Sequence, residues 1–304
     1  MIETIPYDDI WNGLRKEWGY RFSAAVVRSN TPCGETILYE CGECDLQFFE
    51  PAAPGDTEFY RELGENPRYY SPWKWEFDWA GTRLPAAAEV LDVGCGRGDF
   101  LAEVAPKVRR AVGIDGSPDA ISHAGARGLE AVAGELEELA EGFAGAFTAV
   151  CAFHVLEHIP DPVRFVGSLR RCLRPGGSLF VSVPNRLRSG RPAFEPLDFP
   201  PHHLTRWSPR SLGRLAIVCG LQVRELALEP VDLSVPRDRL RDRIRSAAEA
   251  IPAVGGFIGT WLPKLAWRIV YPGPSAKLYR RLGVFERAGM VGMSMVARLS
   301  EPSL

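Results

Sequence analysis

Apolar runs of strand length alternate with amphipathic segments through the middle of this chain. These runs cover 90–93, 110–115, 146–153 and 178–184. The residues that follow the first three runs have helical spacing, with polar positions on one face. This alternation predicts an α/β fold from Glu89 to about Leu228, in which helices cover a mostly parallel sheet.

The pattern changes after a strand predicted at 221–228. Residues 236–287 have helical spacing, and a final strand is predicted at 291–298, so a helical insertion separates the last two strands. We expect this insertion to cap a substrate pocket. The alternatives are a helix on a membrane surface, which the interfacial character of Trp261 and Trp267 would suit, and a dimer contact.

The turn after the first predicted strand contains glycine at alternate positions, Gly94, Gly96 and Gly98. Glycine lets the backbone turn sharply and pass close to a flat, charged cofactor, because it has no side chain in the way. The spacing differs from the dinucleotide fingerprint G-x-G-x-x-G, since Asp99 occupies the position of the last glycine. A nicotinamide-dependent oxidoreductase is therefore disfavoured.

Two acidic residues frame this loop. Asp92 precedes Gly94 by two positions, and Asp115 ends the next predicted strand. A carboxylate at that strand end can accept hydrogen bonds from both ribose hydroxyls of an adenosine. Ser117 and Pro118 then begin a helix as its N-cap and first helical residue.

Together with the stretches 146–162 and 173–185, these motifs resemble the class I S-adenosylmethionine-dependent methyltransferases that act on small molecules, including the quinone-biosynthesis type. The resemblance implies a Rossmann-like, doubly wound sheet of seven strands with an antiparallel last strand. It also implies S-adenosylmethionine as the cofactor, which becomes S-adenosylhomocysteine. The predicted parts are an N-terminal ribbon-like appendage at 1–56, a cofactor-binding core at 57–235, the helical cap at 236–287 and a final strand at 288–304.

The resemblance further implies which residues bind the cofactor. The glycine loop lies against the methionine half, with Asp92 fixing the loop, while Asp115 and the adjacent Gly116 hold the ribose. Further contacts are implied around the adenine and beside the sulfonium, at the ends of the third and fourth strands: Glu135, Leu136, Phe153 and His154.

Aromatic residues are concentrated at 57–81, before the first core strand. In related enzymes the helix in this position closes over the cofactor, often with a tyrosine, and Tyr69 or Tyr70 is the candidate here. The alternative is that the rings only pack this helix onto the sheet.

An oxygen or nitrogen acceptor usually loses a proton, and histidine is the natural base. His154 is one candidate; His202 and His203 lie in a loop after the fifth strand, at the edge where such sheets bind ligands. A structural role for these imidazoles and catalysis without a base are the alternatives. His154 to His158 also matches the metalloprotease pattern H-x-x-E-H, but Pro160 disrupts the required helix. We interpret that match as accidental and His158 as structural.

The N-terminal segment contains three cysteines, Cys33, Cys41 and Cys44. Related bacterial methyltransferases carry a zinc ribbon there with two C-x-x-C pairs, but Asn30 stands at the position of the first cysteine. Because structural zinc requires four protein ligands, we favour a metal-free β-hairpin. Zinc bound by these three cysteines is the alternative.

Composition narrows the functional class. The chain has 304 residues, of which 46% are hydrophobic, and a net charge of −2 without a basic stripe, which disfavours general nucleic-acid binding. No apolar run is long enough for a spanning helix, and the acidic N-terminus lacks the features of a signal peptide. The odd number of cysteines, seven, favours reduced thiols in a cytoplasmic protein.

We therefore expect a cytoplasmic enzyme that methylates a small molecule at a hydroxyl oxygen: a natural product, a quinone-like compound or a glycan intermediate. N- or C-methylation would use the same cofactor loop. Methylation of RNA or protein would predict a basic funnel or an Asn/Asp-Pro-Pro-Tyr loop at 153–156, and neither is present. A non-catalytic binding module would predict decay of the glycine loop or of Asp115.

Overall fold

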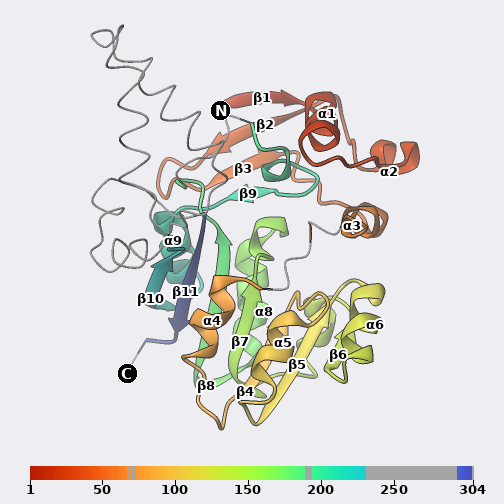
Figure 1. Cartoon of the computed structure of the whole chain (residues 1–304). Helices are drawn as coiled ribbons and strands as arrows, with labels where there is room; N and C mark the ends of the chain where they lie inside the picture. Colours follow the sequence, from red (N-terminus) through yellow and green to blue (C-terminus); the bar gives the residue numbers. More distant parts are fainter. Residues whose placement is uncertain (67–68, 70–72, 189–193, 231–292, 303–304) are drawn as a thin grey trace, which may run out of the picture. The chain divides into compact units, whose positions relative to one another are not determined.

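The computed structural model describes residues 1–66, 69, 73–188, 194–230 and 293–302. These residues form a large mixed sheet with helices on its faces and a smaller antiparallel sheet (Figure 1). The insertion predicted at 236–287 and the lid candidate Tyr70 lie outside the described residues. Within the described ranges, none of the helices has the length and apolar character needed to cross a membrane.

Seven strands form the large sheet: β4 (Glu89–Val93), β5 (Arg110–Asp115), β6 (Glu130–Ala133), β7 (Phe147–Phe153), β8 (Leu173–Pro184), β10 (Gln222–Leu228) and β11 (Ser294–Ser300). Their order is β10-β11-β8-β7-β4-β5-β6. Neighbours from β8 to β6 are parallel, whereas β11 is antiparallel to both β8 and β10. The predicted doubly wound sheet with an antiparallel last strand is confirmed.

Six helices surround this sheet: α4 (Trp75–Gly81), α5 (Asp99–Val104), α6 (Pro118–Ala126), α7 (Leu136–Leu139), α8 (Pro162–Cys172) and α9 (Pro209–Val218). Side chains alternate between the faces of a strand, and the core divides accordingly. Phe77 of α4 and Phe100 of α5 pack on Phe153 of β7 in one apolar cluster. Leu169 of α8 and Leu212 of α9 belong to the other.

Polar side chains set the starts of α6, α8 and α9; at α8, the Asp161 side chain accepts the Arg164 N–H. The Ser117 side chain accepts the Ala120 N–H at the start of α6, as the sequence predicts. Ser208 and Ser211 form a capping box at the start of α9. Two 3₁₀ turns, η1 (Leu156–His158) and η2 (Pro196–Asp198), lie in the loops after β7 and β8.

The smaller sheet combines the N-terminal residues with one later segment. Its strands, in spatial order, are β1 (Glu3–Pro6), β2 (Glu35–Glu40), β3 (Gln47–Glu50) and β9 (Thr205–Arg206). The accompanying helices are α1 (Tyr7–Glu17), α2 (Ala24–Ser29) and α3 (Thr57–Gly64). Phe49 of β3, Phe59 of α3 and Phe199 share one apolar core. The N-terminal region therefore supports the loop that carries His202 and His203.

Candidate active site

The three glycines of the predicted cofactor loop have backbone conformations that favour glycine. Gly94, Gly96 and Gly98 have φ angles of 72°, 54° and 79° in the turn between β4 and α5. A Cβ atom at Gly98 would lie 2.6 Å from the Leu129 side chain, and one at Gly94 would overlap Val155. The loop thus has both the conformation and the tight packing that exclude larger residues.

Asp115 holds this loop from the end of β5. Its Oδ2 accepts the Gly96 N–H and its Oδ1 accepts the Ser117 N–H, each at 2.8 Å. Burial raises the pKa of Asp115, although these two N–H groups oppose the shift. Asp92, which we expected to fix the loop, is buried near the end of β4. Asp115 thus hydrogen-bonds to the loop directly, and the role expected of Asp92 in fixing the loop stays a prediction.

The other predicted cofactor residues have two kinds of surroundings. Glu135 lies beside the turn that follows Asp115, because a Cβ atom at Gly116 would be 2.7 Å from its Oε1. Burial raises the pKa of Glu135. In contrast, Leu136 is buried in the core, and Phe153 packs its ring against phenylalanines of α4 and α5. Thus the Glu135 carboxylate lies beside the turn after Asp115, whereas Leu136 and Phe153 are part of the apolar interior.

His154 follows β7 and lies between two buried glutamates. Its Nε2 is 2.8 Å from Glu76 Oε1, and its Nδ1 is 3.4 Å from Glu157 Oε1. Burial alone would raise the pKa of Glu76 and lower that of His154. The interaction with His154 lowers the pKa of Glu76 instead, and the interactions with Glu157 and Glu76 raise the pKa of His154. The φ angle of His154 is 56°, a strained conformation of the kind found at functional sites.

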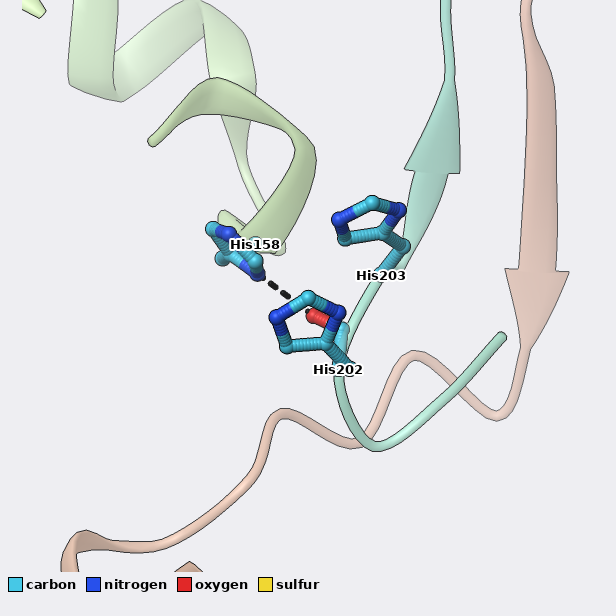
Figure 2. A group of neighbouring side chains, drawn as sticks. All are labelled: His158, His202 and His203. Atoms are coloured by element: carbon cyan, nitrogen blue, oxygen red, sulfur yellow. Dashed lines mark hydrogen bonds between the residues drawn. The ribbon is translucent and has the colours of Figure 1, made fainter. Parts of the chain in front are cut away.

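Three further imidazoles converge next to Glu157, and we call His158, His202 and His203 the imidazole cluster (Figure 2). His158 belongs to η1, and the other two belong to the loop before β9. His158 Nε2 and His203 Nε2 each lie 4.0 Å from Glu157 Oε1. Burial alone would raise the pKa of Glu157, but the interactions with His154 and, to a smaller extent, with His158 and His203 lower it to about 2. Glu157 is therefore a buried anion.

Carbonyl and hydroxyl groups orient two of these imidazoles. His158 Nδ1 lies 2.6 Å from the carbonyl oxygen of His202, and His202 Nδ1 lies 2.8 Å from that of Leu197. The Tyr60 hydroxyl is 3.3 Å from His158 Nδ1, and the Tyr69 hydroxyl is 3.2 Å from His202 Nε2. Burial lowers the pKa of His158 to about 4 and lowers the pKa of His202 well below its usual range. Both rings are therefore neutral near pH 7.

The third imidazole has an acidic neighbour. His203 Nδ1 lies 3.5 Å from Asp198 Oδ1, and the other oxygen of Asp198 accepts a hydrogen bond from Arg188 at 2.5 Å. Asp198 and Arg188 are both buried. A deeply buried ion pair is tolerated only with close geometry. The Asp198–Arg188 pair therefore holds the Asp198 carboxylate in a fixed position beside His203.

The structure brings together all the histidines considered as catalytic candidates, but the sequence did not reveal the acidic residues around them. Glu76 comes from α4, where its sequence neighbours give no sign of a site. Glu157 had a weak signal, a charged side chain that directly follows the apolar Leu156 in the turn after the apolar strand β7. The interpretation of His154 to His158 as an accidental pattern overlooked this signal.

The predicted zinc candidates have other surroundings. Among the described residues, the one group of side chains arranged to hold a metal ion is the imidazole cluster, so Cys33, Cys41 and Cys44 do not form such a group. Asn30 is buried, and its side-chain oxygen accepts the Asp56 N–H at 2.8 Å. Asn30 thus connects α2 with the start of α3.

Comparisons with known proteins fit this geometry. Residues 68–226, just over half of the chain, match a family model described as a methyltransferase domain. The chain belongs to this methyltransferase family. Membership confirms the predicted class, with S-adenosylmethionine as the cofactor.

Individual relatives cover only part of this methyltransferase. A ubiquinone biosynthesis O-methyltransferase from Xanthomonas oryzae pv. oryzae is 38% identical over 116 residues, which are 36% of this chain and 48% of that protein. A probable S-adenosylmethionine-dependent methyltransferase from Mycolicibacterium smegmatis is 34% identical over 145 residues, covering 46% and 54%. The chain thus spans about half the length of the curated relatives it matches.

A solved structure shows the same fold. It is a methyltransferase from Thermotoga maritima, titled a possible histamine N-methyltransferase. It has 15% sequence identity and a TM-score of 0.51, over 80% of this chain and 98% of that one. This similarity concerns the arrangement of strands and helices, not the acceptor.

Proposed function

We propose that this methyltransferase transfers a methyl group from S-adenosylmethionine to a hydroxyl oxygen of a small molecule. The observation that carries the proposal is the position of His154 and Glu157 relative to the glycine loop. They follow the carboxyl end of β7, which pairs with β4, the strand that leads into the loop. Because parallel sheets of this kind bind ligands beyond the carboxyl ends of their strands, one site can hold cofactor and acceptor together.

The residues near the loop fit the cofactor. S-adenosylmethionine supplies an electrophilic methyl group on a positively charged sulfur. Asp115 would accept hydrogen bonds from the ribose hydroxyls through the lone pairs that its two N–H partners leave available. Glu135, beside Gly116, would accept from the adenine amino group. The glycine loop leaves room for the backbone to approach the methionine half.

His154, Glu157 and the imidazole cluster provide polar surroundings for a hydroxyl acceptor. As the new carbon–oxygen bond forms, the carbon–sulfur bond breaks, its electron pair goes to sulfur, and the proton of the acceptor hydroxyl passes to His203 or to solvent. Both ring nitrogens of His154 face carboxylates, so we assign it a positioning role. Among the described residues, His203 Nε2 faces Glu157 without a hydrogen-bond partner. We place the acceptor hydroxyl at this end of the imidazole cluster.

Sequence similarity supports an oxygen acceptor. The relative from Xanthomonas oryzae is named for O-methylation in ubiquinone biosynthesis, and its match covers 36% of this chain. We propose a quinone-like compound, another natural product or a glycan intermediate as the acceptor. The roles proposed for 236–287, a substrate cap or a contact with a membrane surface, concern residues outside the described ranges.

Transfer of an isotope-labelled methyl group tests the proposal. The protein is incubated with ¹³C-methyl S-adenosylmethionine and a size-fractionated lysate, and the products are identified by NMR, which separates O-methyl, N-methyl and C-methyl carbons. We expect an O-methyl signal in the small-molecule fraction. Label in RNA or protein would overturn the acceptor class, and an N-methyl product would overturn the acceptor atom. Cofactor binding without any product would favour a non-catalytic module.

The cofactor half has its own test. Replacement of Asp115 by Ala should weaken S-adenosylhomocysteine binding by about 2 kcal/mol, the size expected for lost charge-assisted hydrogen bonds. Isothermal titration calorimetry measures this, with Asp119→Ala as the control because Asp119 is an exposed acid on α6. Unchanged affinity in Asp115→Ala would contradict the assignment to the ribose.

A further inference from the structure

Glu157 carries a buried negative charge that the described side chains leave without a hydrogen bond. The residue is 1% exposed, and neither of its carboxylate oxygens has a hydrogen-bond partner. An ionised carboxylate removed from water costs several kcal/mol unless a cation or hydrogen bonds compensate it. His154 Nδ1 lies 3.4 Å from Glu157 Oε1, but the other ring nitrogen of His154 lies closer to Glu76, at 2.8 Å. The cationic groups near Glu157 are therefore shared with other acids: His154 also faces Glu76, and Lys74 interacts electrostatically with Glu76 and Asp92 as well as with Glu157.

The proton positions of the neighbouring imidazoles suit metal binding. His158 places Nδ1 on a backbone carbonyl oxygen at 2.6 Å, so the proton lies on Nδ1 and the lone pair on Nε2. His203 directs Nδ1 towards Asp198, at 3.5 Å, and Nε2 towards Glu157. Metal-binding histidines are commonly held in this way, by a carbonyl or carboxylate at the second ring nitrogen.

The distances also permit a shared ion. Ligand bonds to a divalent transition metal are about 2.0–2.2 Å long, so two ligands of one ion lie at most about 4 Å apart. Glu157 Oε1 is 4.0 Å from both His158 Nε2 and His203 Nε2. The three imidazoles offer nitrogens within 4.8 Å of one another, so a shift of less than about 1 Å brings them to bonding separation.

We propose that Glu157, His158 and His203 bind a divalent transition metal ion that in turn binds the hydroxyl oxygen of the acceptor, with His202 adjoining the site. Two imidazoles and one carboxylate suit zinc, iron, nickel or copper better than magnesium, which prefers oxygen ligands. The inference rests on the proposed O-methylation. A bound cation lowers the pKa of the hydroxyl, so its proton is released to solvent before the oxygen attacks the methyl carbon.

The test uses the full chain after removal of metals with a chelator. Equilibrium dialysis against Zn²⁺, followed by elemental analysis, should give one tightly bound ion per chain. Glu157→Gln and His203→Ala should each weaken this binding on the order of 100-fold, because loss of a ligand costs at least as much as loss of its supporting group. Zn²⁺ should also raise the melting temperature of the original protein but not of these variants.

Matched controls locate the ion. His123→Ala removes an exposed imidazole of α6, and Cys44→Ser removes one of the N-terminal thiols; both should retain Zn²⁺. Loss of Zn²⁺ from Cys44→Ser but not from Glu157→Gln would place the ion at the cysteines and overturn the proposal. S-adenosylhomocysteine binding by each variant shows that it is folded.

The two proposals can fail separately. If the chelated protein methylates its acceptor at the original rate, or binds no Zn²⁺ while binding S-adenosylhomocysteine, the metal site is overturned and O-methylation stands. If the original protein binds no S-adenosylhomocysteine, or produces no O-methyl product with metal present, the proposed function fails whatever the metal result.

Discussion

The glycine loop and the imidazole cluster lie at the carboxyl edge of one sheet, yet they are assembled in opposite ways. The loop is local: its glycines stand at alternate positions of one turn, and Asp115 comes from the adjacent strand β5. The cluster and the acidic residues around it join distant segments, with His158 from η1, His203 from the loop before β9, and Glu76 from α4. The first region depends on backbone conformation and the second on the packing of the whole fold.

The two regions also differ in what stabilises them. At the loop, positive φ angles and close packing select glycine, and backbone N–H groups compensate the Asp115 carboxylate. In the cluster, buried carboxylates and imidazoles compensate one another only in part, since Glu157 lacks hydrogen bonds. Mutations should therefore affect cofactor binding and turnover separately.

The largest effect is expected at the loop. In Gly94→Ala, the alanine would have to keep a positive φ angle that it rarely adopts. Its Cβ atom would also overlap the Val155 side chain. We expect S-adenosylhomocysteine affinity to fall on the order of 100-fold or more, as measured by calorimetry, because the loop must move to relieve the overlap.

Gly125→Ala is the matched control. Gly125 lies in α6, and a Cβ atom there would meet no neighbouring atom, so cofactor affinity should not change. Equal affinity in Gly94→Ala and the original protein would mean that the backbone of this turn does not define the cofactor site.

The contrast explains what the sequence could predict. The alternation of strands and helices, the glycine turn and Asp115 follow from hydrophobic periodicity and short-range spacing, which one chain displays directly. The doubly wound sheet with its antiparallel last strand is instead implied by the family resemblance. The partners of His154 do not, because Glu76 is brought to it by the packing of Phe77 in α4 against Phe153 in β7. Asn30 illustrates the same limit, since its bond to Asp56 becomes visible only when α2 and α3 are placed.

A smaller effect is expected in the imidazole cluster. Glu76→Gln keeps the shape but removes the negative charge that holds His154 Nε2 at 2.8 Å. We expect kcat to fall about tenfold, the lower end of the effect of removing a supporting group, with S-adenosylhomocysteine affinity unchanged. Asp78→Asn is the control, since Asp78 is exposed on the same helix. A parallel loss of cofactor affinity and kcat would show that the two regions are coupled.

The smallest effect concerns the stability of the folded protein and depends on Asp92, near the end of the strand that leads into the glycine loop. Burial raises the pKa of Asp92 well above its usual range; attraction by Lys74 opposes the shift, and repulsion by Asp115 adds to it. An unfolded aspartate has a pKa of about 3.9. As the pH rises above this value, the unfolded chain releases the proton first, so the folded state loses stability until the pH exceeds the raised pKa.

Asn cannot ionise, so Asp92→Asn should lose less stability than the original protein between about pH 5 and pH 8. Melting temperatures at both pH values measure the difference, which we expect to be a few degrees, the response of a domain of this size to about 1 kcal/mol. Asp119→Asn, which changes an exposed acid, should follow the original protein. Parallel melting curves for Asp92→Asn and the original protein would mean that Asp92 keeps an ordinary pKa in the folded state, with its charge compensated by Lys74. The cofactor half, like the imidazole cluster, would then depend on a side chain that packing brings from a distant part of the chain.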